Sequence, residues 1–337
     1  MAEPPALLGE PGDRYPQLLR TGRARWWRPV VGLMLAGAVL VFGGVLLTGA
    51  AYVLAAVSGQ SEDAFAEDSL SPDSVIGLLA NNLVIAMLIP ASVLAVVFAH
   101  RERPGMLAAV TGRLRWALLG RLLAVASAVV LVFFGAGFLL PSASGLSGDA
   151  PPTRTLLGLL AVVLLTTPLQ AGAEEVGFRG YLSQAVASWS PRPLVGTVLA
   201  GAVSAVLFAL AHGLQDAWLF GDRLAFGMVA SWLAWRTGGL EAPIALHVAN
   251  NIVSLVYSAT TGTLAAALSA STLGWQFAVL DVAMMLTFAV VVGRTVGRRH
   301  LVVRAGEVLA GPGAVGYRGP RSSTPPPAGG ENPWGMG

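Results

Sequence analysis

The sequence predicts an all-α fold, a polytopic membrane helix bundle of about eight transmembrane helices with both termini in the cytoplasm. Three observations lead to this prediction. Of the 337 residues, 55% are hydrophobic and only 12% are charged, a balance far from that of an ordinary soluble domain. The apolar residues form long runs, and a run of about eighteen such residues can cross the roughly 30 Å hydrocarbon core as a helix. The arginines lie mostly between these runs, on one predicted side.

The apolar runs define the predicted helices in order along the chain. The fourth run can continue past residue 173 as a helix that leaves the core, and the sixth run is short and weakly bounded. The number of spans is therefore expected to lie between seven and nine. The predicted spans are 30–57, 75–99, 117–140, 155–173, 194–212, 223–236, 242–260 and 275–293.

The basic residues set the orientation through the positive-inside rule. The chain has no lysine, and all of its 21 basic residues except Arg154 and Arg223 fall on one side of an eight-span arrangement, the side of both termini. The loop 59–74, on the other side, has five acidic residues and no basic one. Both termini are therefore predicted to be cytoplasmic. Nucleic-acid binding is not expected, because the arginines form no continuous basic domain.

Composition divides the chain into four parts. Residues 1–28 are rich in Pro, Gly and Arg, which predicts a mobile basic cytoplasmic arm. Residues 29–150 contain the N-terminal transmembrane helices, and residues 151–293 contain the polar motifs described next. Residues 294–337 are first basic and then rich in Pro and Gly, which predicts a disordered cytoplasmic tail. The chain has no cysteine, so disulfides, thiolate ligands and a cysteine nucleophile are excluded.

Three charged side chains end the fourth apolar run, in the stretch AEEVGFRGYL. An ionisable side chain at the middle of a membrane helix costs about 2.5–3.5 kcal/mol on insertion scales, so such residues are usually paired or functional. Glu175 and Arg179 are four residues apart, the spacing at which two side chains meet on a helix. Glu174 points about 100° away around the helix. It therefore lacks that partner and is suited to act as a base.

Two further motifs lie in the fifth and seventh runs. Phe208 and His212 share a helix face in LFALAH, and His247 and Asn251 share one in LHVANN. If the fourth, fifth and seventh helices pack together, Glu174, His212, His247 and Asn251 converge on one polar cavity.

Each feature also has an ordinary structural reading. A Glu–Arg pair at a helix end commonly stabilises the helix, and a histidine or asparagine in a membrane helix commonly bonds to a neighbouring helix. His100 and His300 stand beside arginines at cytoplasmic helix ends, where a solvated interfacial role is expected. The combination of two acids, two histidines and an asparagine on three helices favours a functional site.

These residues resemble the motifs of the CPBP intramembrane proteases, the family of CAAX prenyl endopeptidases and bacteriocin-processing enzymes that is also described as abortive-infection proteins. The resemblance covers about residues 155–260 and identifies 151–293 as the protease core. The family motifs EExxxR, FxxxH and HxxxN occur in the expected order, at Glu174, Glu175 and Arg179, at Phe208 and His212, and at His247 and Asn251.

The resemblance implies an endopeptidase that hydrolyses a peptide bond near the membrane anchor of a protein or peptide substrate. Glu174 and His212 would hold and deprotonate the attacking water. His247 and Asn251 would donate hydrogen bonds to the developing oxyanion. Other motif residues would hold the cavity together, bind substrate or pack against the site. These supporting residues are Glu175, Arg179 and Phe208.

The cofactor is left open between a divalent metal such as zinc and no metal. The family is usually labelled as metalloproteases, although a metal-free glutamate mechanism also fits it. Glu174, His212 and His247 are ligand types suited to a catalytic zinc with an open position for water. The zinc-binding motif HExxH is absent from the sequence.

Two other functions are compatible with the same buried residues. A proton-coupled transporter would depend on Glu174 for flux and would cut nothing. A non-catalytic membrane scaffold, such as an immunity protein on the same fold, would tolerate Glu174→Gln. The arginine-rich, lysine-free and cysteine-free composition is typical of a GC-rich bacterial genome. The expected location is therefore the lipid bilayer of a bacterial plasma membrane, and the expected substrate is a peptide or membrane-anchored protein of the same cell.

Overall fold

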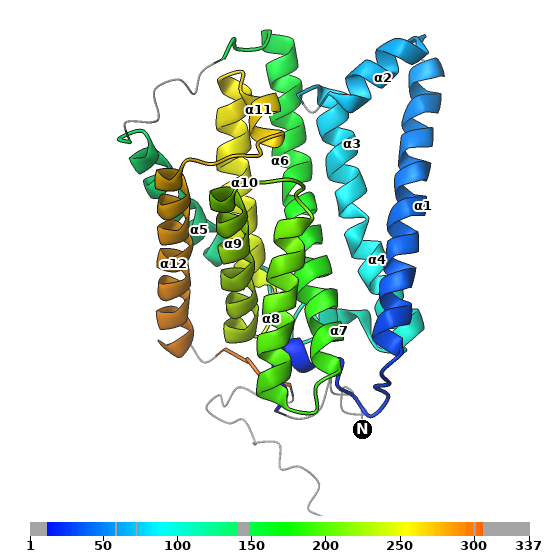
Figure 1. Ribbon diagram of the computed structural model, residues 1–337, viewed down its shortest axis with the longest axis vertical. Coiled ribbons are helices and arrows are strands. Elements are labelled where there is room, and N and C mark those ends of the chain that lie inside the picture. The colour runs from blue at the N-terminus through cyan, green and yellow to red at the C-terminus, as the bar shows by residue number, and fades with distance from the viewer. Residues whose placement is uncertain (1–11, 58, 72, 141–147, 299–300, 306–337) are drawn as a thin grey trace, which may run out of the picture. The chain divides into compact units, whose positions relative to one another are not determined.

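The computed structural model (Figure 1) describes residues 12–57, 59–71, 73–140, 148–298 and 301–305. These residues all belong to one unit, residues 1–307, and are helical with short connections and no strand among them. Within this part of the chain, seven helices are long and apolar enough to cross a bilayer. The predicted all-α membrane bundle is confirmed. Of the predicted tail, residues 294–337, the part up to residue 298 is helical and residue 305 is bonded to the N-terminal segment, so the disorder predicted there is wrong for this part, and the rest from residue 306 onward lies outside the described residues.

The first predicted span forms α1 (Arg28–Val57). The acidic loop that follows contains α2 (Glu62–Leu70). Ser61 caps this helix, because its hydroxyl accepts a hydrogen bond of 3.3 Å from the backbone N–H of Ala64. Acidic residues in the first turn of α2 favour the same helix start.

The second predicted span is built from three consecutive helical pieces. They are α3 (Val75–Ala86), α4 (Leu88–Leu94) and a π-helical turn, Ala95–His100. Together they form one span, Val75–His100, close to the predicted 75–99.

The third and fourth spans follow the same order. They are α5 (Trp116–Gly137) and α6 (Thr153–Glu175), and α6 continues through a π-helical segment, Val176–Leu182, into α7 (Ser183–Ser188). The run from α6 to α7 has 36 residues, which confirms the predicted continuation past residue 173. In Figure 1, α6 stands between α3 and α10 (Glu241–Thr260), and it packs on both.

The remaining helices complete the bundle around α6 and α10. The turn between α8 and α9 is fixed by Asp216, whose carboxylate accepts hydrogen bonds from the backbone N–H groups of Leu219 and Leu273 at 2.8 and 3.3 Å. Asp216 caps α9, which therefore begins earlier than the predicted span 223–236. These helices are α8 (Pro193–Leu210), α9 (Ala217–Thr237), α11 (Leu264–Leu268) and α12 (Trp275–Arg298).

The helix α9 accounts for the difference between about eight predicted spans and seven apolar ones. It is not among the seven apolar helices of the described residues. However, the two described ends of the chain meet, since the Gly12 N–H bonds to the Ala305 carbonyl at 2.9 Å and the Ala305 N–H to the Asp13 carbonyl at 2.8 Å. Ends on one side require an even number of passes, so α9 returns the chain through the bundle, packed on α8 and α12.

The segment that precedes α1 is packed against the bundle from residue 12 onward, although residues 1–28 were predicted to be a mobile arm. Tyr15, Leu18 and Leu19 are buried in an apolar cluster with Leu107 and Leu240. The Tyr15 hydroxyl also donates to the Leu107 carbonyl. The apolar side chains among the arginines explain this packing, and the part of the arm before residue 12 lies outside the described residues.

His100 is buried and not solvated. It is 3% exposed, and its Nε2 lies 3.2 Å from the hydroxyl of Tyr181, which follows the acid–arginine motif. The predicted solvated role is therefore wrong, because His100 ends a π-helical turn that faces the protein interior. His300 lies outside the described residues.

A single arginine joins three segments at the end of the bundle that holds the described chain ends. Arg115 forms a bidentate pair with Glu241, with Nε–Oε1 and Nη2–Oε2 distances of 2.8 and 2.6 Å. The same guanidinium donates to the carbonyls of Thr237 and Val302 at 2.9 and 3.1 Å. The start of α5 is thereby tied to the α9–α10 turn and to residues 301–305.

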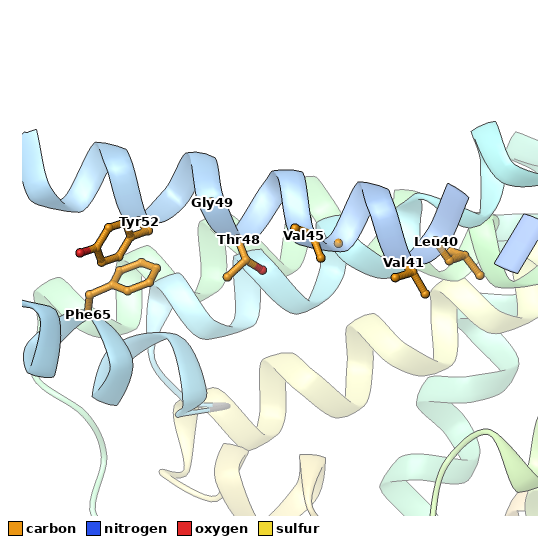
Figure 2. Close-up of a pocket in the computed structure, with 8 residues that line it drawn as sticks. Leu40, Val41, Val45, Thr48, Gly49, Tyr52 and Phe65 are labelled. Atoms are coloured by element: carbon orange, nitrogen blue, oxygen red, sulfur yellow. The ribbon is translucent and has the colours of Figure 1, made fainter. Parts of the chain in front are cut away.

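The structure also has an apolar groove of about 620 Å³ on the outer helices (Figure 2). It runs along α1, from Leu40 to Tyr52, and ends at Phe65 of α2. None of the residues assigned to the polar cavity lines this groove.

We expect Arg115→Met to lower the free energy of unfolding by about 3–5 kcal/mol, because it leaves the fully buried Glu241 carboxylate without its cation. Thermal unfolding in detergent measures the loss. Arg113→Met, at an exposed arginine of the same loop, is the control and should change stability by less than about 0.5 kcal/mol. Equal losses in the two variants would contradict the role assigned to the pair.

Candidate active site

The acid pair, Arg179 and His247 meet where the end of α6 packs against α10. Glu174, Glu175, Arg179 and His247 are 7%, 0%, 1% and 4% exposed. The structure therefore brings together two of the four residues assigned to catalysis, Glu174 and His247, with two of the supporting ones.

Glu175 is the common acceptor of this cluster. Its Oε1 accepts a hydrogen bond of 2.9 Å from Arg179 Nη1 and one of 2.8 Å from His247 Nδ1. Because an ionised carboxylate only accepts hydrogen bonds, the His247 proton is assigned to Nδ1. The spacing in the sequence predicted the contact with Arg179, whereas the contact with His247 depends on how α6 packs against α10.

Aromatic rings enclose the buried cation of Arg179. Its guanidinium carbon lies 4.3 Å from the ring centroid of Phe208, 5.4 Å from that of Phe226 and 5.9 Å from that of Phe178. Each ring face can stabilise a desolvated cation. Phe208 therefore supports the site by packing against Arg179 itself.

A close helix contact brings Phe226 into this enclosure. A Cβ atom at the adjacent Gly227 would lie 2.6 Å from the Cα of Ala205, so only glycine permits α9 to approach α8 this closely. The rings of Phe208 and Phe226 stack with centroids 5.4 Å apart. No motif in the sequence marked Phe226, because its role arises from this contact between helices.

Glu174 has one bonded and one free carboxylate oxygen. Its Oε1 accepts a hydrogen bond of 2.7 Å from Nε2 of Gln170. Its Oε2 is buried without a hydrogen-bond partner and lies 3.6 Å from His247 Nε2. A buried acceptor without a partner is costly, so this oxygen is available to a ligand or water. Oε2 of Glu175 and the Nε and Nη2 atoms of Arg179 are also buried without a hydrogen-bond partner.

His212 lies at the exposed edge of the cluster. It follows α8 in a run of exposed residues, 211–214. Its Nδ1 lies 2.7 Å from the Phe208 carbonyl, and the centroids of the two rings are 4.7 Å apart. The Nδ1 contact leaves Nε2 free, and within the described residues no hydrogen bond or ion pair joins His212 to Glu174.

Asn251 is connected to Glu174 through a residue that the sequence motifs did not mark. Asn251 Nδ2 lies 3.5 Å from Oε1 of Gln170, the same side chain that donates to Glu174. Gln170 is 7% exposed. It precedes Glu174 by four residues, so the spacing rule that paired Glu175 with Arg179 could have found it.

The proposed metal ligands do not assemble into a metal-binding group. Among the residues that the structure describes, no three His, Asp or Glu side chains are placed to hold one metal ion. Two of the three predicted ligands approach each other, and the third, His212, bonds to a backbone carbonyl at the edge.

Residues 154–253 match the family model described as type II CAAX prenyl endopeptidase Rce1-like. The match contains all three motifs and confirms the family resemblance. The uncharacterized protein YyaK of Bacillus subtilis (strain 168) is 34% identical over 96 residues, which are 28% of this chain and 32% of that protein. The chain thus spans about a third of the length of this curated relative. No solved structure gives a significant match.

We expect Arg179→Met to lower the free energy of unfolding by about 3–5 kcal/mol, because it leaves the Glu175 carboxylate buried without its cation. Adding Glu175→Gln should recover part of the loss, since the stranded charge is then removed. Thermal unfolding in detergent compares the single and double variants with Arg236→Met, whose guanidinium donates to a backbone carbonyl. A double variant less stable than Arg179→Met would contradict the pairing.

Proposed function

We propose that the protein, a multi-pass membrane protein whose residues 154–253 match the Rce1-like family of type II CAAX prenyl endopeptidases, is an intramembrane endopeptidase. It hydrolyses a peptide bond near the membrane anchor of a protein or peptide substrate. The observation that carries the proposal is the buried, unpartnered Oε2 of Glu174, 3.6 Å from His247 Nε2.

In the proposed reaction, Glu174 accepts a proton from a water molecule at its free oxygen. The hydroxide that forms attacks the carbonyl carbon of the scissile peptide bond, and the carbonyl oxygen becomes an oxyanion. The proton then passes from Glu174 to the leaving amine nitrogen as the C–N bond breaks. The free Nε2 of His212 would hold the same water from the exposed edge. General-base catalysis of this kind contributes about 10²- to 10⁴-fold.

His247 and Asn251 would stabilise the oxyanion. Glu175 holds His247 by Nδ1, so Nε2 points into the site. Donation from Nε2 requires a doubly protonated ring, whose positive charge balances one of the two carboxylates while Arg179 balances the other. The amide of Asn251, which is partly exposed, supplies the second donor.

We propose a metal-free route, because the acid–base pair is complete in this chain and the three candidate ligands do not converge. The alternative is a divalent metal such as zinc, which would polarise the carbonyl and activate the water. Sensitivity to a chelator distinguishes the two.

We place the protein in a bacterial plasma membrane, as the similarity to a Bacillus subtilis protein supports. The cluster lies among apolar helices, so we propose a peptide or membrane-anchored protein of the same cell as substrate.

We expect the purified protein in detergent to cleave a quenched-fluorescent peptide library, and Glu174→Gln to lower the rate by about 10²- to 10⁴-fold through loss of the base. His212→Ala should also lose cleavage. Glu67→Gln, at an exposed acid on α2, is the matched control and should cleave normally.

Cleavage that resists chelator supports the glutamate-activated water, and chelator sensitivity supports a metal. Unchanged cleavage in Glu174→Gln would refute the site, and flux or partner binding without cleavage would favour a transporter or scaffold.

We expect His247→Ala and Asn251→Ala each to lower kcat by about 10²- to 10³-fold, because each removes a donor that acts on the oxyanion. KM should change little, since the donors strengthen their bonds in the transition state. Steady-state kinetics on one library-derived peptide measures both constants. A raised KM with unchanged kcat would show instead that these residues bind the substrate in its ground state.

A further inference from the structure

Gln170 lies between two residues assigned to opposite parts of the proposed reaction. Its Nε2 is 2.7 Å from Oε1 of Glu174, and its Oε1 is 3.5 Å from Nδ2 of Asn251. The side chain is buried, and it stands on α6 one helical turn before Glu174. None of the three motifs in the sequence includes it.

The chemistry of the neighbours fixes the orientation of the Gln170 amide. The carboxylate of Glu174 only accepts hydrogen bonds, so the amide presents its N–H₂ group to it. The carbonyl oxygen of Gln170 then faces Asn251, which can donate to it. A flipped amide would place two acceptors against each other on the Glu174 side. The direction of donation therefore runs from Asn251 through Gln170 to Glu174.

This direction determines which oxygen of Glu174 remains free. The hydrogen bond to a charged acceptor is of the stronger kind, and it occupies Oε1. Oε2 therefore stays towards His247 Nε2. Without Gln170, rotation of the carboxylate would let either oxygen face the site. The bond from Asn251 also links the proposed oxyanion donor on α10 to the base on α6.

We infer that Gln170 is a positioning residue for the proposed peptide hydrolysis, and this inference rests on the proposed function. Gln170 holds Glu174 by one oxygen so that the other acts on water, and it accepts a hydrogen bond from the amide of Asn251 on the facing helix. Its action passes through these two side chains, and reacting groups must be held within about 0.5 Å of the productive geometry.

A double-variant cycle tests the contact without any need for activity. Gln170→Met should lower the thermal-unfolding midpoint in detergent, because it strands the buried carboxylate of Glu174. In the Glu174→Met background the same substitution should cause little or no loss. If Gln170→Met alone does not fold, recovery of folded protein in that background is the equivalent result.

Gln184→Met is the matched control for this cycle. Gln184 is a fully buried glutamine of α7 whose Nε2 donates to the Met106 carbonyl at 2.9 Å. Its midpoint loss should be the same in both backgrounds. Equal losses for Gln170→Met in both backgrounds would overturn the inference.

Kinetics then tests the positioning role. Gln170→Met should lower kcat by about 10- to 100-fold, as loss of an orienting partner commonly does, and should change KM by less than about 3-fold. Gln184→Met should leave both constants within that smaller range.

The outcomes separate this inference from the proposed function. If cleavage depends on Glu174 but Gln170→Met and Gln184→Met behave alike, the positioning role is overturned and the protease remains. If no cleavage depends on Glu174, both fall, whatever the cycle shows about the contact.

Discussion

The carboxylate of Glu175 is the constraint on which the site depends. It is fully buried among apolar helices, where an unpaired charge is costly, and it must therefore keep its two donors. One donor, Arg179, lies on the same helical run, and the other, His247, lies on α10. The requirement that one buried charge be satisfied thus fixes α6 against α10 and sets the orientation of the imidazole ring.

The hydrogen bonds of Glu175 also distinguish it from the adjacent Glu174. Glu175 accepts hydrogen bonds from a cation and a ring N–H, both at Oε1, and its Oε2 is buried without a hydrogen-bond partner. Glu174 faces a different direction around the helix, receives a single neutral donor at Oε1 and keeps Oε2 free. The aromatic enclosure of Arg179 adds to this difference between the two glutamates. Rings from α8, α9 and the π-helical segment stabilise the cation, and they carry no charge that would replace Glu175 as its partner. Two identical side chains therefore have different surroundings, and under the proposed function they have different roles.

The sequence predicted those features that depend on local spacing or on the bilayer as a solvent. A membrane permits few backbone solutions other than helices, so hydropathy located α1 and the span Val75–His100 to within two residues. The spacing of Glu175 and Arg179 predicted their contact. The partner of His247, the burial of His100 and the ring of Phe226 could not be predicted, because each depends on how separate helices pack. The start of α9 was missed for another reason, since it is set by the Asp216 cap and not by hydropathy.

The proposed site has a buried part between α6 and α10 and an exposed part, and His212 belongs to the exposed part. Glu174, Glu175, Arg179 and His247 are locked by contacts between α6 and α10, whereas His212 stands on a turn whose neighbours 211–214 are exposed. That turn is not free, because Asp216 ties it to the segment before α12 through the N–H of Leu273. Under the proposed function, the exposed imidazole of His212 is therefore the group of the site that water meets outside the buried cluster.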